Sequence, residues 1–348
     1  MAKVLVTGGC GFVGRHLVGQ LAARGDEVRV IDVCDPAEMI PGVEYRNASI
    51  LDPDAMRSAL GGVERLYHIA GIAHLWAHPR SRFDDINRRG TETVIGAAVR
   101  EGTPRIVHCS TESILLPKRG NGHAVSEDHV LPLEDLPGPY TRSKFLGEQA
   151  ALQAARAGAD LVVVNPTVPV GPGDGNMTPP AQMLALFLKG GTPFFLDFTI
   201  NLVDVRDAAA GIVLAGDLGR AGERYILGGE NLRLRELLRL VERLSGRKMP
   251  TRTIHPGIAL SAGIVSDWIS RVTKKCPAAT REGIMLALRS APFDSSKARR
   301  ELGYNPRPVE GALREELAWL MERHISNKGR ALPALPTLRQ EAEVKSPD

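Results

Sequence analysis

The sequence predicts an α/β fold in which a doubly wound parallel sheet is followed by a smaller C-terminal region that binds substrate. Apolar runs of strand length alternate with helical patterns through the first half of the chain, and this alternation stops after Asn165. Strands that alternate with helices form parallel sheets covered on both faces. The 348 residues allow one large domain or two coupled ones, and the 43% apolar and 24% charged residues exclude wholesale disorder.

The expected elements of the first half follow in order. Buried strands are predicted at residues 4–6, 28–31, 65–69, 105–109 and 161–165, with a weaker candidate at 43–45. Between these strands apolar residues recur at intervals of three and four, which predicts helices at residues 13–24, 53–60, 83–100 and 140–157. We therefore assign residues 1–175 to the core of the sheet domain.

The second half has a different texture. Residues 166–180 contain five prolines and three glycines, which predicts an ordered loop. A strand and a helix within residues 199–225 are expected to rejoin the sheet, and the pattern of residues 234–244 predicts an amphipathic helix. Residues 176–198 and 226–327 then form the substrate-binding region. The tail, residues 328–348, is rich in proline and charge and is expected to be disordered.

Composition and spacing exclude several functional classes. The net charge of +4 comes without a long basic run, which argues against nucleic-acid binding. Four cysteines lie far apart without a C-x-x-C pair, so neither a disulfide framework nor a thiolate zinc site is encoded. His74 and His78 stand four apart, but no acidic residue completes a metal motif, so we expect no metal and interpret both as pocket-lid or surface residues. No apolar stretch reaches about 18 residues and no signal peptide is recognisable, which predicts a cytoplasmic protein.

A glycine-rich turn joins the first predicted strand to the first predicted helix. Gly8, Gly11 and Gly14 recur at intervals of three, and Phe12 and Val13 open the helix. Glycines let the backbone approach a pyrophosphate closely, and the helix N-terminus presents N–H groups and a positive dipole end to it. With a strand before it and a helix after it, this turn predicts dinucleotide binding by a Rossmann-type sheet.

Asp32 ends the second predicted strand, 18 residues beyond Gly14. A carboxylate at this position accepts hydrogen bonds from the adenosine ribose and repels a 2′-phosphate. The sequence therefore favours NAD as the cofactor. NADP is not excluded, because Arg29 lies within the same strand.

A second constellation is suited to proton transfer. Tyr140 and Lys144 stand four apart at the start of a predicted helix, which places them on one helical face. A lysine ammonium beside a phenol lowers the phenol pKa, so that the tyrosine can exchange a proton with a substrate oxygen. Ser110 and Thr111 follow a predicted strand, and hydroxyls at the carboxyl end of a parallel strand face the ligand crevice. Glu112 is either a solvated strand-end residue or a further acid/base group.

Together these motifs resemble the extended short-chain dehydrogenases/reductases of the NAD-dependent epimerase/dehydratase class, over about residues 3–325. The family's T-G-x-x-G-x-x-G turn is matched from Thr7 to Gly14, and its Y-x-x-x-K by Tyr140 and Lys144. The resemblance implies that Thr111, or secondly Ser110, is the catalytic hydroxyl. It also implies a homodimer through the helices predicted at 83–100 and 140–157. Further cofactor contacts are implied at Ile50, Ala70, Gly71, Asn87 and Pro166.

Within the family, the chain is most similar in texture to hopanoid-associated sugar epimerases, dihydroflavonol reductases and 3β-hydroxysteroid dehydrogenases. The segment that begins Asn165-Pro166-Thr167 carries this likeness. The chain departs from the family pattern at Ala48-Ser49, where a glycine–aspartate pair is usual. The resemblance therefore implies that one carboxylate contact at the adenine pocket is missing.

Two reactions share this scaffold. The protein either interconverts a secondary alcohol and a ketone and releases a changed cofactor, or it epimerises or dehydrates a nucleotide sugar and retains NAD. Residues 177–198 are rich in leucine, methionine and phenylalanine, with Lys189 as their only cation. This favours a lipophilic, sterol- or terpenoid-like substrate over a diphosphate, although a helix packed into the core would look the same. A non-catalytic NAD-binding regulator is a third reading, against which the intact proton-transfer set argues.

Overall fold

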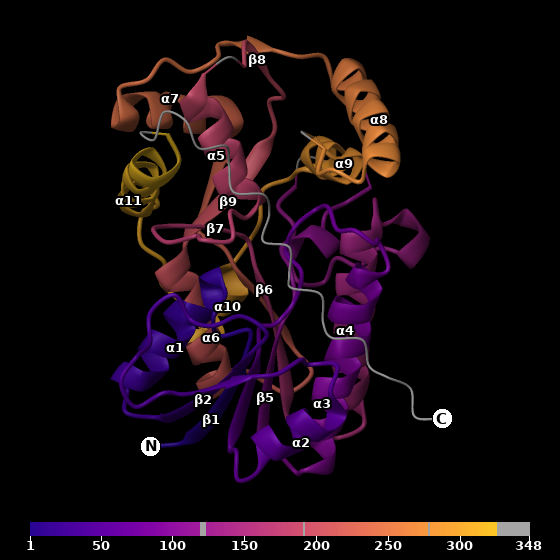
Figure 1. Ribbon diagram of the computed structural model, residues 1–348, viewed down its shortest axis with the longest axis vertical. Coiled ribbons are helices and arrows are strands. Elements are labelled where there is room, and N and C mark those ends of the chain that lie inside the picture. The colour runs from indigo at the N-terminus through magenta and orange to yellow at the C-terminus, as the bar shows by residue number, and fades with distance from the viewer. Residues whose placement is uncertain (119–122, 191, 278, 326–348) are drawn as a thin grey trace.

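The computed structural model describes residues 1–118, 123–190, 192–277 and 279–325. The chain forms two parts, one above the other in Figure 1. The lower part contains a parallel sheet between two layers of helices, and the upper part contains α5, α7, α8, α9 and α11. The predicted tail, residues 328–348, lies outside the described residues.

Among the described residues, seven parallel strands form the main sheet, in the order β10-β6-β5-β4-β1-β2-β3. This order reverses direction at β1, as doubly wound sheets do. Every residue of β6 is buried, because helices cover both faces of the sheet and leave no polar side. The strands are β1 (Lys3–Thr7), β2 (Glu27–Asp32), β3 (Glu44–Asn47), β4 (Arg65–His68), β5 (Arg105–Cys109), β6 (Leu161–Pro166) and β10 (Arg224–Leu227).

The helices divide between the two faces of this sheet. One core joins the sheet to α1 (Phe12–Ala23), α6 (Val205–Leu218) and α10 (Ser296–Leu302). The other joins it to α2 (Pro53–Leu60), α3 (Thr91–Arg100) and α4 (Pro139–Arg156). Helix α2 begins where the sequence marks it, because the Asp52 carboxylate accepts from two backbone N–H groups and proline follows at the first position.

The second part has its own core, to which α5 (Pro179–Lys189), α7 (Leu234–Ser245) and α11 (Glu310–Leu320) contribute. Within the described residues, a three-stranded sheet beside it has the order β11-β9-β7, formed by Glu230–Arg233, Thr199–Asp204 and Val168–Val170. A two-stranded ladder pairs β8 (Phe194–Phe195) with β12 (Arg252–Thr253). Helices α8 (Pro256–Thr273) and α9 (Arg281–Arg289) pack on each other. Short helical turns are η1 (Asp84–Gly90), η2 (Glu112–Ile114), η3 (Leu133–Asp135) and η4 (Met321–Ile325).

The structure differs from the sequence predictions in three places. Strand β9 joins the three-stranded sheet, and β10 is the strand that completes the main sheet; an apolar strand pattern does not specify its partner. The loop predicted at 166–180 contains strand β7. The helix predicted at 83–100 begins as the π-helical turn η1, where the Thr91 hydroxyl donates to the Asn87 carbonyl at 2.8 Å. Glycine at position 147 lets α4 approach that widened turn, since a Cβ there would lie 2.3 Å from the Asn87 oxygen.

Within the part of the chain that the structure describes, none of the helices combines the length and apolarity needed to cross a bilayer.

Candidate active site

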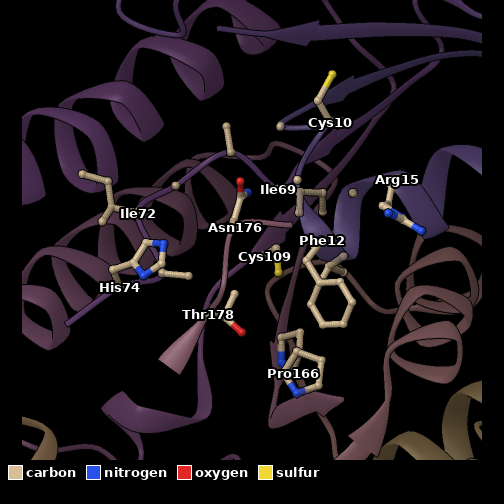
Figure 2. A pocket seen from close by; sticks show the side chains of 18 of the residues that line it. Cys10, Phe12, Arg15, Ile69, Ile72, His74, Cys109, Pro166, Asn176 and Thr178 are labelled. Atoms are coloured by element: carbon tan, nitrogen blue, oxygen red, sulfur yellow. The ribbon is translucent and has the colours of Figure 1, made fainter. Parts of the chain in front are cut away.

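A cavity of about 2690 Å³ lies at the carboxyl ends of the main strands, between the two parts of the molecule. Pockets for one small ligand usually measure roughly 300–1,000 Å³, so this cavity has room for a dinucleotide and a substrate together. Figure 2 shows Phe12 and Arg15 of α1 on one side and Ile72 and His74 on the other. His78 lines the cavity as well.

The glycine turn forms one end of this cavity. Gly8 has φ +75°, and a Cβ there would lie 2.6 Å from the backbone of Ala70, so no other residue fits without displacing the segment that follows β4. A Cβ on Gly14 would lie 2.0 Å from the Gly8 oxygen. Helix α1 begins directly after Gly11, which has no side chain to cap it. Gly11, Phe12 and Val13 all line the cavity, so the positive end of α1 faces it.

Asp32 lies at the end of β2, beside the glycine turn. One carboxylate oxygen accepts from the Cys10 N–H at 3.0 Å and the other from the Cys34 N–H at 3.1 Å. Burial raises the pKa of Asp32, and these backbone hydrogen bonds oppose the rise. The carboxylate is thus held in place on the cavity wall, which Ile50 also lines.

The structure brings the other implied cofactor contacts to the same wall, with one exception. Ala70, Gly71 and Pro166 line the cavity. Asn87 does not, because it is buried behind the wall, where its amide bonds both the N–H and the carbonyl of Ile72 and the Ser143 hydroxyl. Asn87 therefore fixes the loop after β4 to helix α4, and its contact with the cofactor stays a prediction.

Tyr140 and Lys144 lie on the first turns of α4, and both line the cavity. The Lys144 ammonium donates to the Cys109 carbonyl at 2.8 Å, and burial lowers the pKa of Lys144. The Tyr140 hydroxyl is hydrogen-bonded to Thr111. The expected lowering of the phenol pKa by Lys144 is wrong for this structure. Burial raises the pKa of Tyr140 and the Glu112 charge raises it further, which outweighs the bond to Thr111.

Hydroxyl groups gather beside the phenol, where β5 ends. The Thr111 hydroxyl donates to the Glu112 carboxylate at 2.8 Å and also lies 2.7 Å from the Ser113 hydroxyl. Burial raises the pKa of Glu112. The Ser110 hydroxyl is buried at the cavity wall and has no hydrogen-bond partner among the described residues. A buried hydroxyl without a partner is costly, which is consistent with a ligand group bonding it.

Sequence reasoning missed Glu282, which lies on α9 in the second part of the molecule. Its carboxylate accepts from the Thr141 N–H at 2.8 Å, the Tyr140 N–H at 3.2 Å and the Thr141 hydroxyl at 2.9 Å. It therefore caps α4, whose N-cap residue is Gly138, a residue without a side chain. That glycine is the one signal in the sequence of a missing cap, but it does not point to a partner more than a hundred residues away.

The apolar residues of 177–198 divide between the core and the cavity. Leu184, Phe187, Leu188 and Phe195 belong to the core of the second part, so most of this segment packs as a structural helix would. Lys189 is exposed and does not line the cavity. The apolar wall comes from other segments as well. It includes Trp76, Leu116, Met183, Phe198, Leu286 and Phe293.

Cations also line the cavity, contrary to the expectation drawn from residues 177–198 alone. Arg15 donates to the Gly173 carbonyl, and Arg206 pairs with Asp204 and Glu315. The guanidinium groups of Arg15 and Arg206 are therefore already engaged by the protein. Further cations that line the cavity are Arg82, Lys274 and Arg323.

Known proteins resemble this chain over most of its length. The model of the NAD dependent epimerase/dehydratase family matches residues 4–228. The chain belongs to this family. It is 33% identical to sterol demethylase protein B of Methylococcus capsulatus, over 92% of this chain and 98% of that protein. It is 32% identical to a putative dihydroflavonol 4-reductase of Synechocystis sp., over 90% and 93% of the two chains. The crystal structure of gox2253 superposes with a TM-score of 0.80 at 33% identity, over 93% and 99% of the two chains.

Family membership confirms the predicted fold class, the cofactor and the enzyme class. The chain is an NAD-dependent dehydrogenase or reductase of the extended short-chain type. The residues at the cavity fit the cofactor independently of this likeness. The glycine turn leaves no space for a Cβ, the N-terminal end of α1 faces the cavity, and a fixed carboxylate lies beside both.

Proposed function

We propose that the protein interconverts a secondary alcohol and a ketone on a lipophilic, sterol- or terpenoid-like substrate. The observation that carries this proposal is that Tyr140, Thr111 and Ser110 share one cavity with an apolar wall, to which α9 contributes Leu286. The likeness to a sterol demethylase protein supports the same substrate class.

The residues that line the cavity have different roles in binding the cofactor and in the reaction. Gly8, Gly11 and Gly14 admit the pyrophosphate against the N-terminus of α1, and Asp32 accepts from the adenosine ribose. When bound, NAD accepts a hydride from the alcohol carbon or, as NADH, donates one to the ketone carbon. We propose that Lys144 holds the ribose of the cofactor. Its ammonium is already fixed by the hydrogen bond that it donates to the Cys109 carbonyl.

Tyr140 moves the proton. Because the pKa of the phenol is raised, Tyr140 holds its proton at neutral pH and is ready to donate it to a ketone oxygen during reduction. In the oxidative direction the same oxygen must first lose that proton, so we expect oxidation to speed up as pH rises. The Thr111 hydroxyl fixes the phenol by its hydrogen bond, and the unpartnered Ser110 hydroxyl is suited to bond the reacting oxygen.

Binding experiments separate this substrate class from nucleotide sugars. With saturating NAD, calorimetry should detect tighter binding of a polycyclic secondary alcohol than of a UDP-sugar. Leu286→Arg should weaken binding of the alcohol by about tenfold or more, because a buried leucine contributes about 1.5–3 kcal/mol. Leu288→Arg is the matched control on the same helix, since Leu288 does not line the cavity. Tighter binding of the UDP-sugar, unaffected by Leu286→Arg, would instead support an epimerase or dehydratase that retains NAD.

We further propose that the chain acts in the cytoplasm as a homodimer, with η1, α3 and α4 at the interface. Light scattering on the purified protein tests the dimer, and a monomer at micromolar concentration would contradict it.

A further inference from the structure

Helix α8 has its large apolar side chains on the outside. Trp268 is 67% exposed and Val272 is 69% exposed, and Ile258, Val265 and Ile269 are exposed on the same side of the helix. The opposite side of α8 is formed by small residues, and Ala259, Gly263 and Ser270 are buried. An amphipathic helix of a water-soluble protein normally shows the reverse arrangement. We call the five exposed residues the apolar face of α8.

Close packing on α9 fixes this orientation. A Cβ on Gly263 would lie 2.5 Å from the Ile284 side chain, so the small face of α8 is the only one that fits against α9 at this point. The apolar face is therefore a surface of the folded molecule. In Figure 1, α8 lies at the upper right edge of the molecule, outside α9.

Positive charges flank the apolar face at both ends. Arg271, Lys274 and Lys275 lie at the C-terminal end and Arg252 lies just before the helix, and all four are exposed. Within the described chain, none of the four takes part in an ion pair. The one acidic residue of α8, Asp267, is paired with Arg80. An apolar stripe with unpaired cations beside it is the pattern of a helix that lies in a membrane interface.

We propose that α8 docks the protein on the surface of an anionic lipid bilayer, with its apolar face inserted between the headgroups. Lys274, the residue that follows the helix, also lines the cavity, and so do Gly283, Leu286 and Ala287 of α9. The docked helix thus stands beside the cavity wall, where a lipophilic substrate leaving the bilayer would enter. The docking rests on the surface alone, and only this route of delivery rests on the proposed function.

A second copy of the chain is a less suitable occupant of the same face. Cations lie at both ends of α8, so packing two copies helix against helix, parallel or antiparallel, brings like charges together. Anionic headgroups pair with those cations at either end. The exposed tryptophan also suits the boundary between headgroups and acyl chains.

Vesicle binding of the full-length protein tests the proposal without cofactor or substrate. The protein should co-sediment with vesicles of phosphatidylglycerol mixed with phosphatidylcholine, and Trp268 fluorescence should shift to shorter wavelength. The double variant Trp268→Glu/Val272→Glu should lower the partition coefficient at least about tenfold. Leu186→Glu is the control, because Leu186 is an exposed apolar residue on α5 and should leave binding unchanged. Arg271→Gln and Lys275→Gln should each weaken binding roughly fivefold on anionic vesicles, and high salt should have the same effect.

Three results would overturn the docking. The first is that the wild type does not bind anionic vesicles at low salt. The second is that the double variant binds them as tightly as the wild type does. The third is that the wild type is a dimer and the double variant is a monomer. The last outcome would assign the face to a second copy. Because these assays contain no substrate, their result is independent of whether calorimetry supports a lipophilic alcohol.

Discussion

Replacing Glu282 by Gln removes the charge that caps α4 and keeps the size of the side chain. The carboxylate accepts three hydrogen bonds at 2.8–3.2 Å, whereas the amide has a single acceptor oxygen and an NH₂ group that faces a donor. A hydrogen bond to a charged group contributes about 1.5–3 kcal/mol, and a charge at a helix N-terminus adds about 0.3–1 kcal/mol. Burial raises the pKa of Glu282 despite these hydrogen bonds, so it cancels the gain that is specific to the charge, and the remaining loss is that of a buried donor left without an acceptor. We therefore expect the free energy of unfolding to fall by about 2 kcal/mol.

The same variant should change the pH dependence of catalysis. The Glu282 charge contributes to the raised pKa of Tyr140, so removing that charge should lower the pKa of the phenol. The pH profile of kcat/KM, measured by hydride transfer, should therefore move to lower pH, and urea unfolding should report the loss of stability. Glu134→Gln is the matched control, because Glu134 is an exposed carboxylate near the start of α4. A profile identical to that of the wild type would refute the electrostatic link to Tyr140, even if stability falls.

Three further variants test other parts of the account. Tyr140→Phe should lower turnover by about 10²–10⁴ and leave the calorimetric affinity for NAD nearly intact, and unchanged turnover would contradict the assignment. Asp32→Ala should narrow the preference for NAD over NADP in binding titrations, and a wild-type preference for NADP would show that Asp32 was misread. Burial raises the pKa of Glu316 from 4.5 to about 8, so its contribution to stability is present at low pH and is lost as pH rises through 8. The wild type should therefore lose about 2 kcal/mol between pH 6 and 8 and Glu316→Gln should not, and equal urea midpoints in both proteins at both pH values would contradict this.

Local patterns in the sequence were sufficient for the sheet and for one side of the cavity. Each of these features depends on contacts within a few residues or on the end of a strand, so the spacing of nearby residues is enough to predict it. They are the glycine turn, Asp32 and the Tyr140–Lys144 pair. The parallel sheet followed from the alternation of strands with helices, and the six strands predicted before residue 166 all belong to it.

Contacts between distant segments could not be predicted. Strand β9 carries the same apolar pattern whether it pairs in the main sheet or with β7 and β11. The apolar residues of α5 look alike whether they meet a ligand or the core, and most meet the core. In the sequence Glu282 is an ordinary residue of a helix, and only the folded structure shows that its carboxylate accepts from the Tyr140 N–H. The raised pKa of that phenol depends on burial and on Glu112, neither of which the Y-x-x-x-K spacing contains.

The most direct test of the central claim is the net change in cofactor during turnover. The purified enzyme is mixed with NAD and a polycyclic secondary alcohol, and the absorbance of the reduced nicotinamide is followed while the ketone is quantified. We predict that NADH and ketone form in equal amounts, that a UDP-sugar produces neither, and that Tyr140→Phe suppresses both. Interconversion of a UDP-sugar without net NADH would contradict the account, and so would tight NAD binding without turnover of any alcohol.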